Sequence, residues 1–406
     1  AITATTGIAA LGIGGTTIHR VSGLGIWKGT YEDYLSTYGD TSPWFRRQQR
    51  ELKEIDVLIT DEVSMLSAQG LGFVVDRLRD ARGSLPQIIV VGDYTQLPAV
   101  ARPEDIEAYG PMVAQTSYKC PAWKELNPTI CYLDKSWRAE GDDTLKFILD
   151  NIATGKGRTP ENIEALSSIA VTKDVEASNA SILMTTNRDV DAHNARQQSF
   201  NDGKQVTYSA IYDSPQAENY AKALGIPDEL VLKDGDRVMI TQNIDPNSET
   251  REARIIDMET GDVANFPICN GMIGTFVAGT RPKVMYEKDG KHYLIQFLDR
   301  HAYAQTEVRP VSTGQGTVPM DVPILTVLQY PIKLAYAISV HKSQGQTLDH
   351  ILVDLTQCWM PNLGYVALSR VRSVDDITLI KRGAKVGSPN ALLVTEESLK
   401  IKQEIL

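Results

Sequence analysis

The sequence predicts an α/β protein built on open parallel sheets, with an all-β module inserted into the chain. Apolar runs of Val, Ile and Leu at residues 57–59, 88–91, 182–184 and 335–340 lack polar alternation and indicate strands buried on both faces. Helical stretches lie between the runs, at residues 68–79 and 142–154 among others. Buried strands that alternate with helices are typical of parallel sheets, which bind ligands at the carboxyl ends of their strands.

Composition excludes several classes of protein. The 406 residues carry 41 Lys and Arg against 51 Asp and Glu, and 42% are hydrophobic, which excludes disorder for most of the chain. No apolar run approaches the roughly 20 residues of a membrane span. The net charge of −10 argues against a basic coat for duplex DNA, but a narrow groove for one strand remains compatible with it. The four cysteines form no CxxC pair, which indicates reduced thiols and an intracellular protein. We expect it to be cytoplasmic in a bacterium or phage and nuclear or mitochondrial in a eukaryote. The six histidines are scattered, so a His-based metal site is not expected.

The string DVLITDEVSML delivers two adjacent carboxylates, Asp61 and Glu62, to the end of a buried strand. Mg²⁺ prefers hard oxygen ligands beside nucleotide phosphates, so Asp61 is the expected magnesium ligand. Glu62 is then placed to orient or deprotonate an attacking water. An isolated Asp-Glu pair is more often a solvated acidic turn, and the apolar strand before it favours the functional interpretation.

A second apolar run ends in the string GDYTQLP, where Gly92 permits a tight turn and Gln96 can hydrogen-bond a γ-phosphate or its attacking water. Two arginines farther along, Arg138 in SWRAEGD and Arg370 in YVALSR, can neutralise charge that develops during phosphoryl transfer. Surface salt bridges are the simpler interpretation for either arginine taken alone.

Two further strings join a strand to a polar turn. HKSQGQTLD follows residues 335–340 and brings a cation, a hydroxyl and amides into one turn that can bind phosphate oxygens. The opening TATTGIAALGIGGTTIHR reads as strand, turn and helix, with helix-start amides and Thr hydroxyls suited to a DNA phosphate. An ordinary helix cap explains the opening string equally well.

Residues 206–331 differ from the rest of the chain. Turn signals at Asp234-Gly235, Asn270-Gly271, Asp289-Gly290 and residues 314–316 separate short alternating runs, which predicts an inserted β module. Residues 22–55 begin Gly-rich and end in a basic helix within WFRRQQRELKEI. Trp27 and Trp44 in this excursion could stack on DNA bases, although core packing explains them as well.

These strings, in this order along residues 1 to about 380, resemble the motif series of the Pif-type DNA helicases of superfamily 1B, with RecD-type helicases as near neighbours. The resemblance implies two RecA-like P-loop NTPase domains with parallel sheets, the second with an inserted small Src-homology-3-like β barrel. The first would cover residues 1–135, with a wedge at 22–55. The second would cover 136–205 and 332–406, and the β module 206–331.

The resemblance also implies an activity: ATP-driven 5′→3′ translocation on single-stranded DNA, with duplex unwinding in replication, repair, recombination or telomere maintenance. ATP is the implied substrate and Mg²⁺ the cofactor. The implied partners are single-stranded DNA, duplex junctions and replication or repair proteins. The protein is expected to be a monomer and to have no membrane partner. The implied residues are Asp61, Glu62, Gln96, Arg138 and Arg370 in catalysis; Gly92, Asp93, Lys342, Gln344, Gly345 and Gln346 in nucleotide binding; and Thr5, Thr6, Gly7, Thr17, His19, Asn187, His341 and Ser343 in DNA binding.

The sequence departs from that family at one point, because it contains no phosphate-binding loop of the form GxxxxGK[ST]. The Gly-Lys pairs at Lys156, Lys204 and Lys291 all fail the pattern. The chain opens at Ala1 in what reads as a strand, so we expect an N-terminal truncation that leaves this fragment inactive as an ATPase and prone to aggregate. Two alternatives stay open: a natural non-catalytic remnant that binds single-stranded DNA, and a RecD-type subunit of a nuclease or relaxase motor.

Overall fold

The computed structural model describes residues 1–23, 31–38, 43–171, 181–246, 252–288, 290–313, 316–348, 350–381 and 385–405. The chain divides into two compact units. Unit 1 contains Ala1–Ile26, Leu52–Asp191 and Ala337–Leu406, and unit 2 contains Trp27–Glu51 and Ala192–Tyr336. Trp27 and the side chain of Trp44 lie outside the described residues, so their roles stay predictions.

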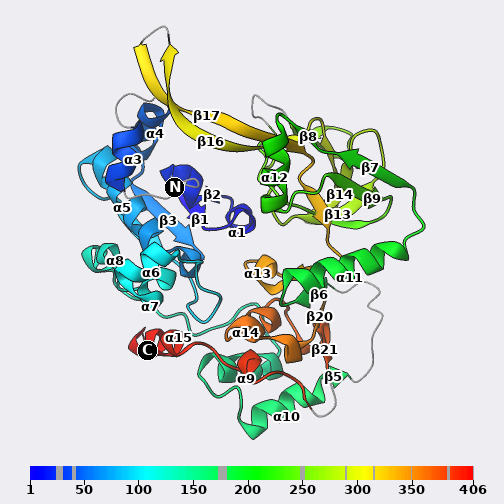
Figure 1. Cartoon of the computed structure of the whole chain (residues 1–406). Helices are drawn as coiled ribbons and strands as arrows, with labels where there is room; N and C mark the ends of the chain where they lie inside the picture. The colour runs from blue at the N-terminus through cyan, green and yellow to red at the C-terminus, as the bar shows by residue number, and fades with distance from the viewer. Residues whose placement is uncertain are drawn as a thin grey trace. The chain divides into compact units, whose positions relative to one another are not determined.

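Unit 1 contains a four-stranded parallel sheet in the order β2-β1-β3-β4, as the sequence predicts (Figure 1). Ala4 lies opposite Asp61, and Thr60 lies opposite Val90, so the carboxyl ends of β1, β3 and β4 meet at one edge. Polar residues that follow these strands therefore gather at that edge. The strands are Ile2–Ala4 (β1), Thr16–Thr17 (β2), Val57–Asp61 (β3) and Gln87–Val90 (β4).

Helices cover this sheet, and α5 contributes more buried residues to its core than any other element. Leu71, Val75 and Leu78 of α5 are buried in one cluster with Leu58 of β3. Each such buried side chain stabilises the fold by about 1.5–3 kcal/mol. The α5 helix begins where the Ser67 hydroxyl accepts a hydrogen bond from the Gly70 N–H, as expected of an N-cap. The helices are Gly7–Gly12 (α1), Ile18–Ser22 (α2), Ala68–Arg82 (α5), Pro103–Tyr109 (α6), Pro111–Thr116 (α7) and Pro121–Leu126 (α8).

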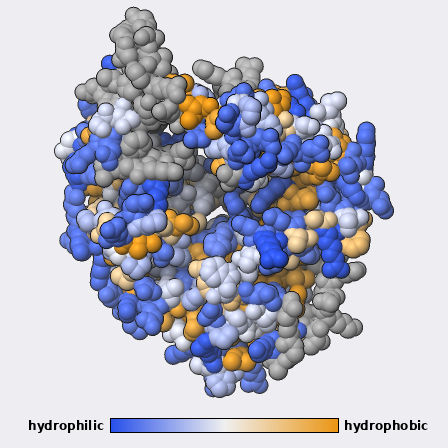
Figure 2. Space-filling model, viewed as in Figure 1, coloured by the Kyte–Doolittle hydropathy of each residue, from blue (hydrophilic) through white to orange (hydrophobic). Residues whose placement is uncertain are grey.

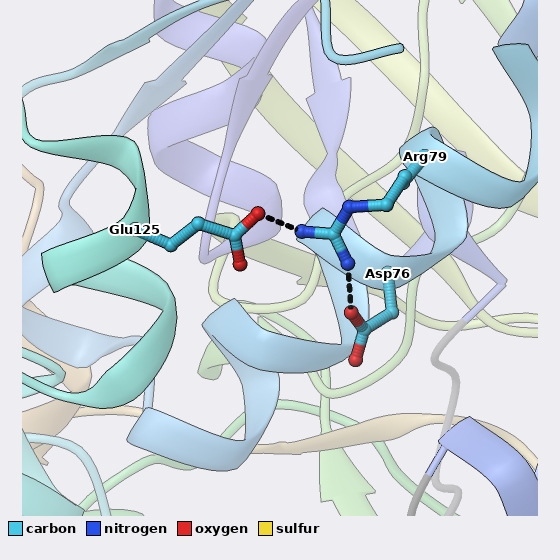
Figure 3. Close-up of polar contacts among 3 residues, drawn as sticks. All are labelled: Asp76, Arg79 and Glu125. Atoms are coloured by element: carbon cyan, nitrogen blue, oxygen red, sulfur yellow. Dashed lines mark hydrogen bonds and ion pairs between the residues drawn. The ribbon is translucent and has the colours of Figure 1, made fainter. Parts of the chain in front are cut away.

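A surface ion-pair group connects α5 with α8. Arg79 of α5 donates to Asp76 one turn earlier, at 2.7 Å, and to Glu125 of α8 (Figure 3). All three side chains are partly exposed, so the group contributes at most about 1 kcal/mol to stability. Its contribution is to orient α8 rather than to hold the core together.

The prediction that residues 88–91 are buried on both faces is wrong. Within the described residues, β4 pairs only with β3 and is the last strand of its sheet. Ile89 and Val91 point to one face and are 39% and 43% exposed, whereas Ile88 and Val90 point to the other face and pack against the core cluster. An apolar run identifies a strand, but it does not reveal whether other elements cover both of its faces.

A second parallel sheet in unit 1 has the order β19-β6-β20-β21-β5. Ile182 and Leu183 of β6 and all three residues of β19 are buried, so the predicted runs at 182–184 and 335–340 are confirmed as strands, the latter over a shorter range. The strands are Ala170–Val171 (β5), Ser181–Met184 (β6), Ala337–Ser339 (β19), Ile351–Val353 (β20) and Ile377–Ile380 (β21). The helices of this part are Asp143–Ala153 (α9), Pro160–Ser168 (α10), Asn187–Ser199 (α11, which continues into unit 2), Val340–Ser343 (α13), Leu363–Leu368 (α14) and Glu396–Ile405 (α15).

Unit 2 is rich in antiparallel strands, as predicted. A seven-stranded sheet has the order β12-β11-β15-β14-β13-β10-β18, and the glycines of two predicted turns, Gly235 and Gly271, adopt φ angles of 84° and 98°. Asp289 and residues 314–315 lie outside the described residues. The seven strands are Arg237–Ile240 (β10), Ala253–Asp257 (β11), Val263–Ala264 (β12), Ile273–Val277 (β13), Lys283–Lys288 (β14), Lys291–Phe297 (β15) and Ile332–Leu334 (β18).

Two smaller sheets, three helices and the second part of α11 also belong to the described part of unit 2, and the helix α12 corrects the all-β prediction. Pro215 occupies the start of α12, and Ala217 and Ala221 pack on Val327, so apolar residues at helical spacing form a helix here. The predicted basic helix is confirmed as α4. The elements are Gln205–Ser209 (β7), Ile211–Tyr212 (β8), Glu229–Lys233 (β9), His301–Thr313 (β16), Gly316–Gln329 (β17), Tyr31–Tyr38 (α3), Pro43–Lys53 (α4, which continues into unit 1) and Pro215–Leu224 (α12).

Hydrophilic residues predominate on the face drawn in Figure 2, with apolar residues in separate patches. Of the helices in the described part of the chain, none combines the length and apolar character that a bilayer span requires.

Candidate active site

The two predicted carboxylates lie at the end of β3, where the backbone is strained. Glu62 adopts the left-handed conformation, with φ 55° and ψ 40°. This conformation costs a non-glycine residue about 1–2 kcal/mol. It is held by three hydrogen bonds: the Glu62 N–H to Asp61 Oδ1 (2.8 Å), the Thr5 hydroxyl to the Glu62 carbonyl (3.0 Å), and the Val63 N–H to the Val91 carbonyl (2.9 Å). Backbone strain maintained in this way is often found at functional sites.

The Glu62 carboxylate is electrostatically unusual. Burial raises its pKa above the ordinary value, the negative charges of Asp61 and Asp93 raise it further, and Arg370 and Arg138 oppose the shift. Its Oε2 atom is buried without a hydrogen-bond partner among the described residues. A buried carboxylate with a raised pKa and a free oxygen can accept a proton from water.

The loop after β4 approaches the backbone closely at Gly92 and orders Asp93. A Cβ atom on Gly92 would lie 3.0 Å from the Val63 nitrogen and 3.2 Å from the Ser64 nitrogen, so a side chain there would require the backbone to shift by a few tenths of an ångström. The Oδ1 atom of Asp93 accepts hydrogen bonds from the Thr95 hydroxyl and from the Thr95 N–H at 2.8 Å. The loop therefore presents Gln96 in a defined position.

Arg370 lies just after α14 and is 1% exposed. Its guanidinium donates to the carbonyls of Val366 (2.8 Å), Ser343 (3.4 Å) and Gln346 (3.3 Å), and to Gln96 Oε1 (3.4 Å). Burial, and next the nearby charge of Arg138, lower the pKa of Arg370 to about 10. The guanidinium therefore remains charged at neutral pH and lies beside the predicted γ-phosphate sensor.

Arg138 reaches the same region from an exposed segment without regular secondary structure. Its Nη1 atom donates to the carbonyl of Ser369 at 2.8 Å, next to Arg370 in the chain. Its charge lowers the pKa of both Glu62 and Arg370. The structure thus brings together all five predicted catalytic residues, Asp61, Glu62, Gln96, Arg138 and Arg370.

The turn after β19 lies against the same cluster. Gly345 has φ 77°, and a Cβ atom there would lie 3.7 Å from Glu62 Oε1 and 3.8 Å from Thr6 Oγ1. Gln344 is buried, donates to the Leu97 carbonyl at 3.4 Å, and leaves its Oε1 atom without a partner in the described structure. Of the other predicted residues in this turn, His341 and Lys342 are exposed, Ser343 is buried and Gln346 is partly buried.

The predicted DNA-binding residues divide into two groups. Thr5 and Thr6 lie beside Glu62, where the Thr6 hydroxyl also accepts from the Ala9 N–H at 3.3 Å near the start of α1, which Gly7 opens. The described contacts do not connect Thr17 or His19 with this cluster. The Thr17 hydroxyl caps α2, and burial lowers the pKa of His19.

Asn187 and Ser343 are two further predicted DNA contacts. Asn187 is exposed at the start of α11. The Ser343 hydroxyl donates to the Val340 carbonyl at 2.8 Å inside the fold. The DNA-contact assignments for both groups stay predictions.

Sequence reasoning missed three residues that contact the GDYTQLP loop. The Tyr365 hydroxyl donates to Asp93 Oδ2 at 2.9 Å, and the Asn362 Nδ2 atom donates to the Gln96 carbonyl at 2.7 Å. The Ser398 hydroxyl donates to the Tyr94 carbonyl at 2.6 Å. Tyr365 stands within the string YVALSR that pointed to Arg370, which was the one available signal.

Asp61 is the residue of this site that fits a magnesium ion. Its Oδ1 atom accepts the Glu62 N–H, and no described hydrogen bond occupies Oδ2. Among the residues that the structure describes, no group of three or more His, Cys, Asp or Glu side chains forms a metal site. A single carboxylate is compatible with Mg²⁺, which commonly keeps several waters and binds substrate phosphates.

Comparison of the sequence with known proteins finds one family model and several similar proteins. A family model described as an AAA domain matches residues 2–115. A protein of Psychrobacter sp. named "ATP-dependent DNA helicase Pif1" is 32% identical over 94% of this chain and 61% of its own length. A protein of Bdellovibrio bacteriovorus with the same name is 29% identical, over 93% of this chain and 77% of its own length. The chain thus spans less than two thirds of the Psychrobacter protein.

Solved structures show the fold. The Pif1 helicase of Candida albicans aligns with a TM-score of 0.72 at 23% identity, over 100% of this chain and 89% of that one. A Bacteroides Pif1 helicase in complex with ADP-AlF3 and single-stranded DNA aligns with a TM-score of 0.74 at 22% identity, over 99% and 86%. These likenesses and the two parallel sheets of unit 1 identify a two-domain RecA-like α/β fold.

Proposed function

We propose that this chain, which is related to the Pif1 DNA helicases over more than nine tenths of its length, forms the ATP-hydrolysing, DNA-translocating part of a DNA helicase. One observation carries the proposal. Glu62 and Gln96, at the ends of strands of the first sheet, meet Arg370 from the second sheet, with Arg138 beside it. This set combines a proton acceptor, a neutral amide and two cations, which phosphoryl transfer requires.

The chemistry assigned to these residues is hydrolysis of the terminal phosphoanhydride of ATP. A water oxygen attacks the γ-phosphorus, the bond from that phosphorus to the β–γ bridging oxygen breaks, and the water proton passes to Glu62. Gln96 orients the water or a γ-phosphate oxygen, and Arg370 and Arg138 neutralise the charge of the transition state. Mg²⁺ bound with the nucleotide would be held by Asp61 and would supply further charge neutralisation.

The sequence supplies only part of a nucleotide site. These 406 residues contain no GxxxxGK[ST] loop, so neither its amide cradle nor its lysine is present to bind the β- and γ-phosphates. We therefore propose that this chain alone hydrolyses ATP slowly. A non-catalytic module that binds single-stranded DNA is the second candidate function, and the experiment below distinguishes the two.

The finer parts of the proposal rest on the resemblance to the Pif-type helicases. They are 5′→3′ movement on single-stranded DNA, a role in replication, repair, recombination or telomere maintenance, and a Src-homology-3-like barrel in the β-rich part of unit 2. The Bacteroides Pif1 helicase was solved in complex with single-stranded DNA, which supports the choice of substrate. We assign the DNA backbone contacts to the Thr5, Thr6 and His341 region, with phosphate contact and base stacking rather than sequence readout as the source of affinity.

The test compares Glu62→Gln with the unchanged protein, using the complete product of its gene. ATP hydrolysis stimulated by single-stranded DNA should fall at least about 100-fold, as for loss of a general base, while DNA binding should change little. Glu125→Gln, which alters a surface carboxylate on α8, is the matched control and should retain full activity. Undiminished hydrolysis by Glu62→Gln would refute the assignment of Glu62. DNA binding without hydrolysis by the unchanged protein would favour the non-catalytic module.

A further inference from the structure

The α14 helix and the residues at its two ends provide three separate contacts to the loop Asp93–Gln96. Arg370 donates to the Gln96 side chain at 3.4 Å, Asn362 to the Gln96 carbonyl at 2.7 Å, and Tyr365 to Asp93 at 2.9 Å. The loop follows a strand of the first sheet, whereas α14 belongs to the part of unit 1 that contains the second sheet. These contacts therefore join residues separated by at least 266 positions in the chain.

The Tyr365 contact completes the hydrogen bonding of Asp93. One Asp93 oxygen accepts from the N–H and hydroxyl of Thr95, and the other accepts from Tyr365. Burial, and next the Asp93 charge, raise the pKa of Tyr365, so its hydroxyl stays protonated and donates throughout the physiological pH range. Asp93 thus fixes the loop internally with one oxygen and attaches it to α14 with the other.

The Asn362 contact is just as specific. Asn362 has φ 70°, in the left-handed region that only glycine adopts freely, and its Nδ2 atom points to the Gln96 carbonyl. The same side chain accepts the Thr395 N–H at 2.8 Å and contacts the Ser398 hydroxyl at 3.2 Å. Ser398 in turn donates to the Tyr94 carbonyl, so the start of α15 supports the loop at a second point.

We propose that Tyr365 and Asn362 are positioning residues that hold the Asp93–Gln96 loop against α14, so that Gln96 and Arg370 meet at the terminal phosphate. This inference rests on the proposed function and adds residues that couple the two sheets. Neither residue touches the reacting atoms. Gln96 and Arg370 act on charge that appears during hydrolysis, so their misplacement should slow turnover without weakening ATP binding.

The first experiment measures DNA-stimulated ATP hydrolysis by the complete gene product carrying Tyr365→Phe. We expect kcat to fall about tenfold with KM for ATP unchanged within about twofold, the pattern of a loss confined to the transition state. Asn362→Asp, which keeps the acceptor for Thr395 but loses the donor to Gln96, should behave in the same way. The matched control is Tyr336→Phe, which removes a tyrosine–aspartate hydrogen bond of 2.8 Å in unit 2 and should leave kcat unchanged.

A double variant tests whether Tyr365 acts through Gln96. If it does, Tyr365→Phe should have little further effect on kcat in a Gln96→Ala background, because the group that it positions is already gone. Two results would overturn the inference. One is a double variant in which the kcat losses of the two single variants multiply, and the other is a single Tyr365→Phe variant with the kcat of the unchanged protein. Equal melting temperatures and equal DNA binding without nucleotide exclude a general folding defect.

A second readout does not depend on activity. Amide hydrogen exchange of the Thr95 and Gln96 N–H groups should accelerate in Tyr365→Phe and stay unchanged in Tyr336→Phe, because only the former loosens the loop. Unchanged exchange in Tyr365→Phe would overturn the inference. If the unchanged protein hydrolyses no ATP, the proposed function fails, and the exchange result still decides whether Tyr365 holds the loop.

Discussion

The two parallel sheets of unit 1 supply different parts of the candidate site, and they differ in how well their strands are covered. The first supplies Glu62 and Gln96 and ends in β4, whose Ile89 is 39% exposed. The second leads to Arg370, and Ile351 in its strand β20 is fully buried. The Arg370 guanidinium therefore lies in a well-packed core. The carboxylates of Asp61 and Glu62 and the loop Asp93–Gln96 instead follow strands at or next to the edge of their sheet.

The two parts of the proposed site are therefore stabilised in different ways. Arg370 is held by carbonyls of its own part of the fold, so its position depends on a well-packed core. The loop after β4 follows the last strand of its sheet in the described part of the chain. Hydrogen bonds from Asn362, Tyr365 and Ser398 stabilise this loop. Substitutions should therefore affect stability and activity differently in the two sheets.

The largest expected effect separates the two arginines. Arg370→Met should lower the free energy of unfolding by about 3 kcal/mol or more. The reason is that each buried carbonyl left without its donor costs about 1–3 kcal/mol. Arg138→Met removes an exposed side chain and should change stability by less than about 0.5 kcal/mol. Chemical denaturation of both variants measures this contrast.

Both arginine variants should nevertheless lose ATPase activity in the complete gene product, by about 100-fold or more, as expected for arginines that neutralise the transition state. Equal stability losses would show that Arg138 is as deeply integrated as Arg370. Normal hydrolysis by Arg138→Met would remove Arg138 from the site.

The next effect compares the strands directly. Ile351→Ala in β20 should cost about 2–5 kcal/mol, because it leaves a cavity in a closed core. Ile89→Ala in β4 should cost less than about 1 kcal/mol, because part of that side chain already contacts solvent. Urea denaturation of both variants of this chain measures the difference. A similar cost at both positions would contradict the contrast between the sheets.

The open edge itself gives a third prediction. Exposed edge strands with apolar side chains template association between chains, and an edge lysine prevents it. Ile89→Lys should therefore raise the protein concentration at which this chain aggregates, as followed by light scattering. Val100→Lys is the matched control, because Val100 is 93% exposed but belongs to no strand. If the two variants behave alike, hydrophobicity rather than the strand edge governs aggregation.

The sequence predicted the parts of the site in which an apolar strand runs into polar residues. Asp61, Glu62 and Gln96 follow such runs, and parallel pairing brings their positions to one edge of the sheet. Tyr365 and Asn362 could not be predicted in the same way, because their partners lie 272 and 266 residues away and only tertiary packing brings them together. The exposure of β4 was missed for a related reason, since a strand's own residues do not specify its neighbours.

The smallest expected effect is a pH dependence that originates in Glu62. Its pKa is raised above the ordinary value of 4.5, mainly by burial, so the folded protein binds this proton more tightly than the unfolded chain does. Between pH 4.5 and the raised folded-state pKa, the folded state holds more protons, so stability falls as pH rises through this window. Glu62→Gln carries no titrating group and should lack that decline. The measurement is the free energy of unfolding of both proteins at several pH values from 4.5 upward. If the free energies of unfolding of the two proteins change with pH in parallel, the pKa of Glu62 is not raised in the folded protein. The carboxylate would then be better solvated or better paired than the described contacts indicate.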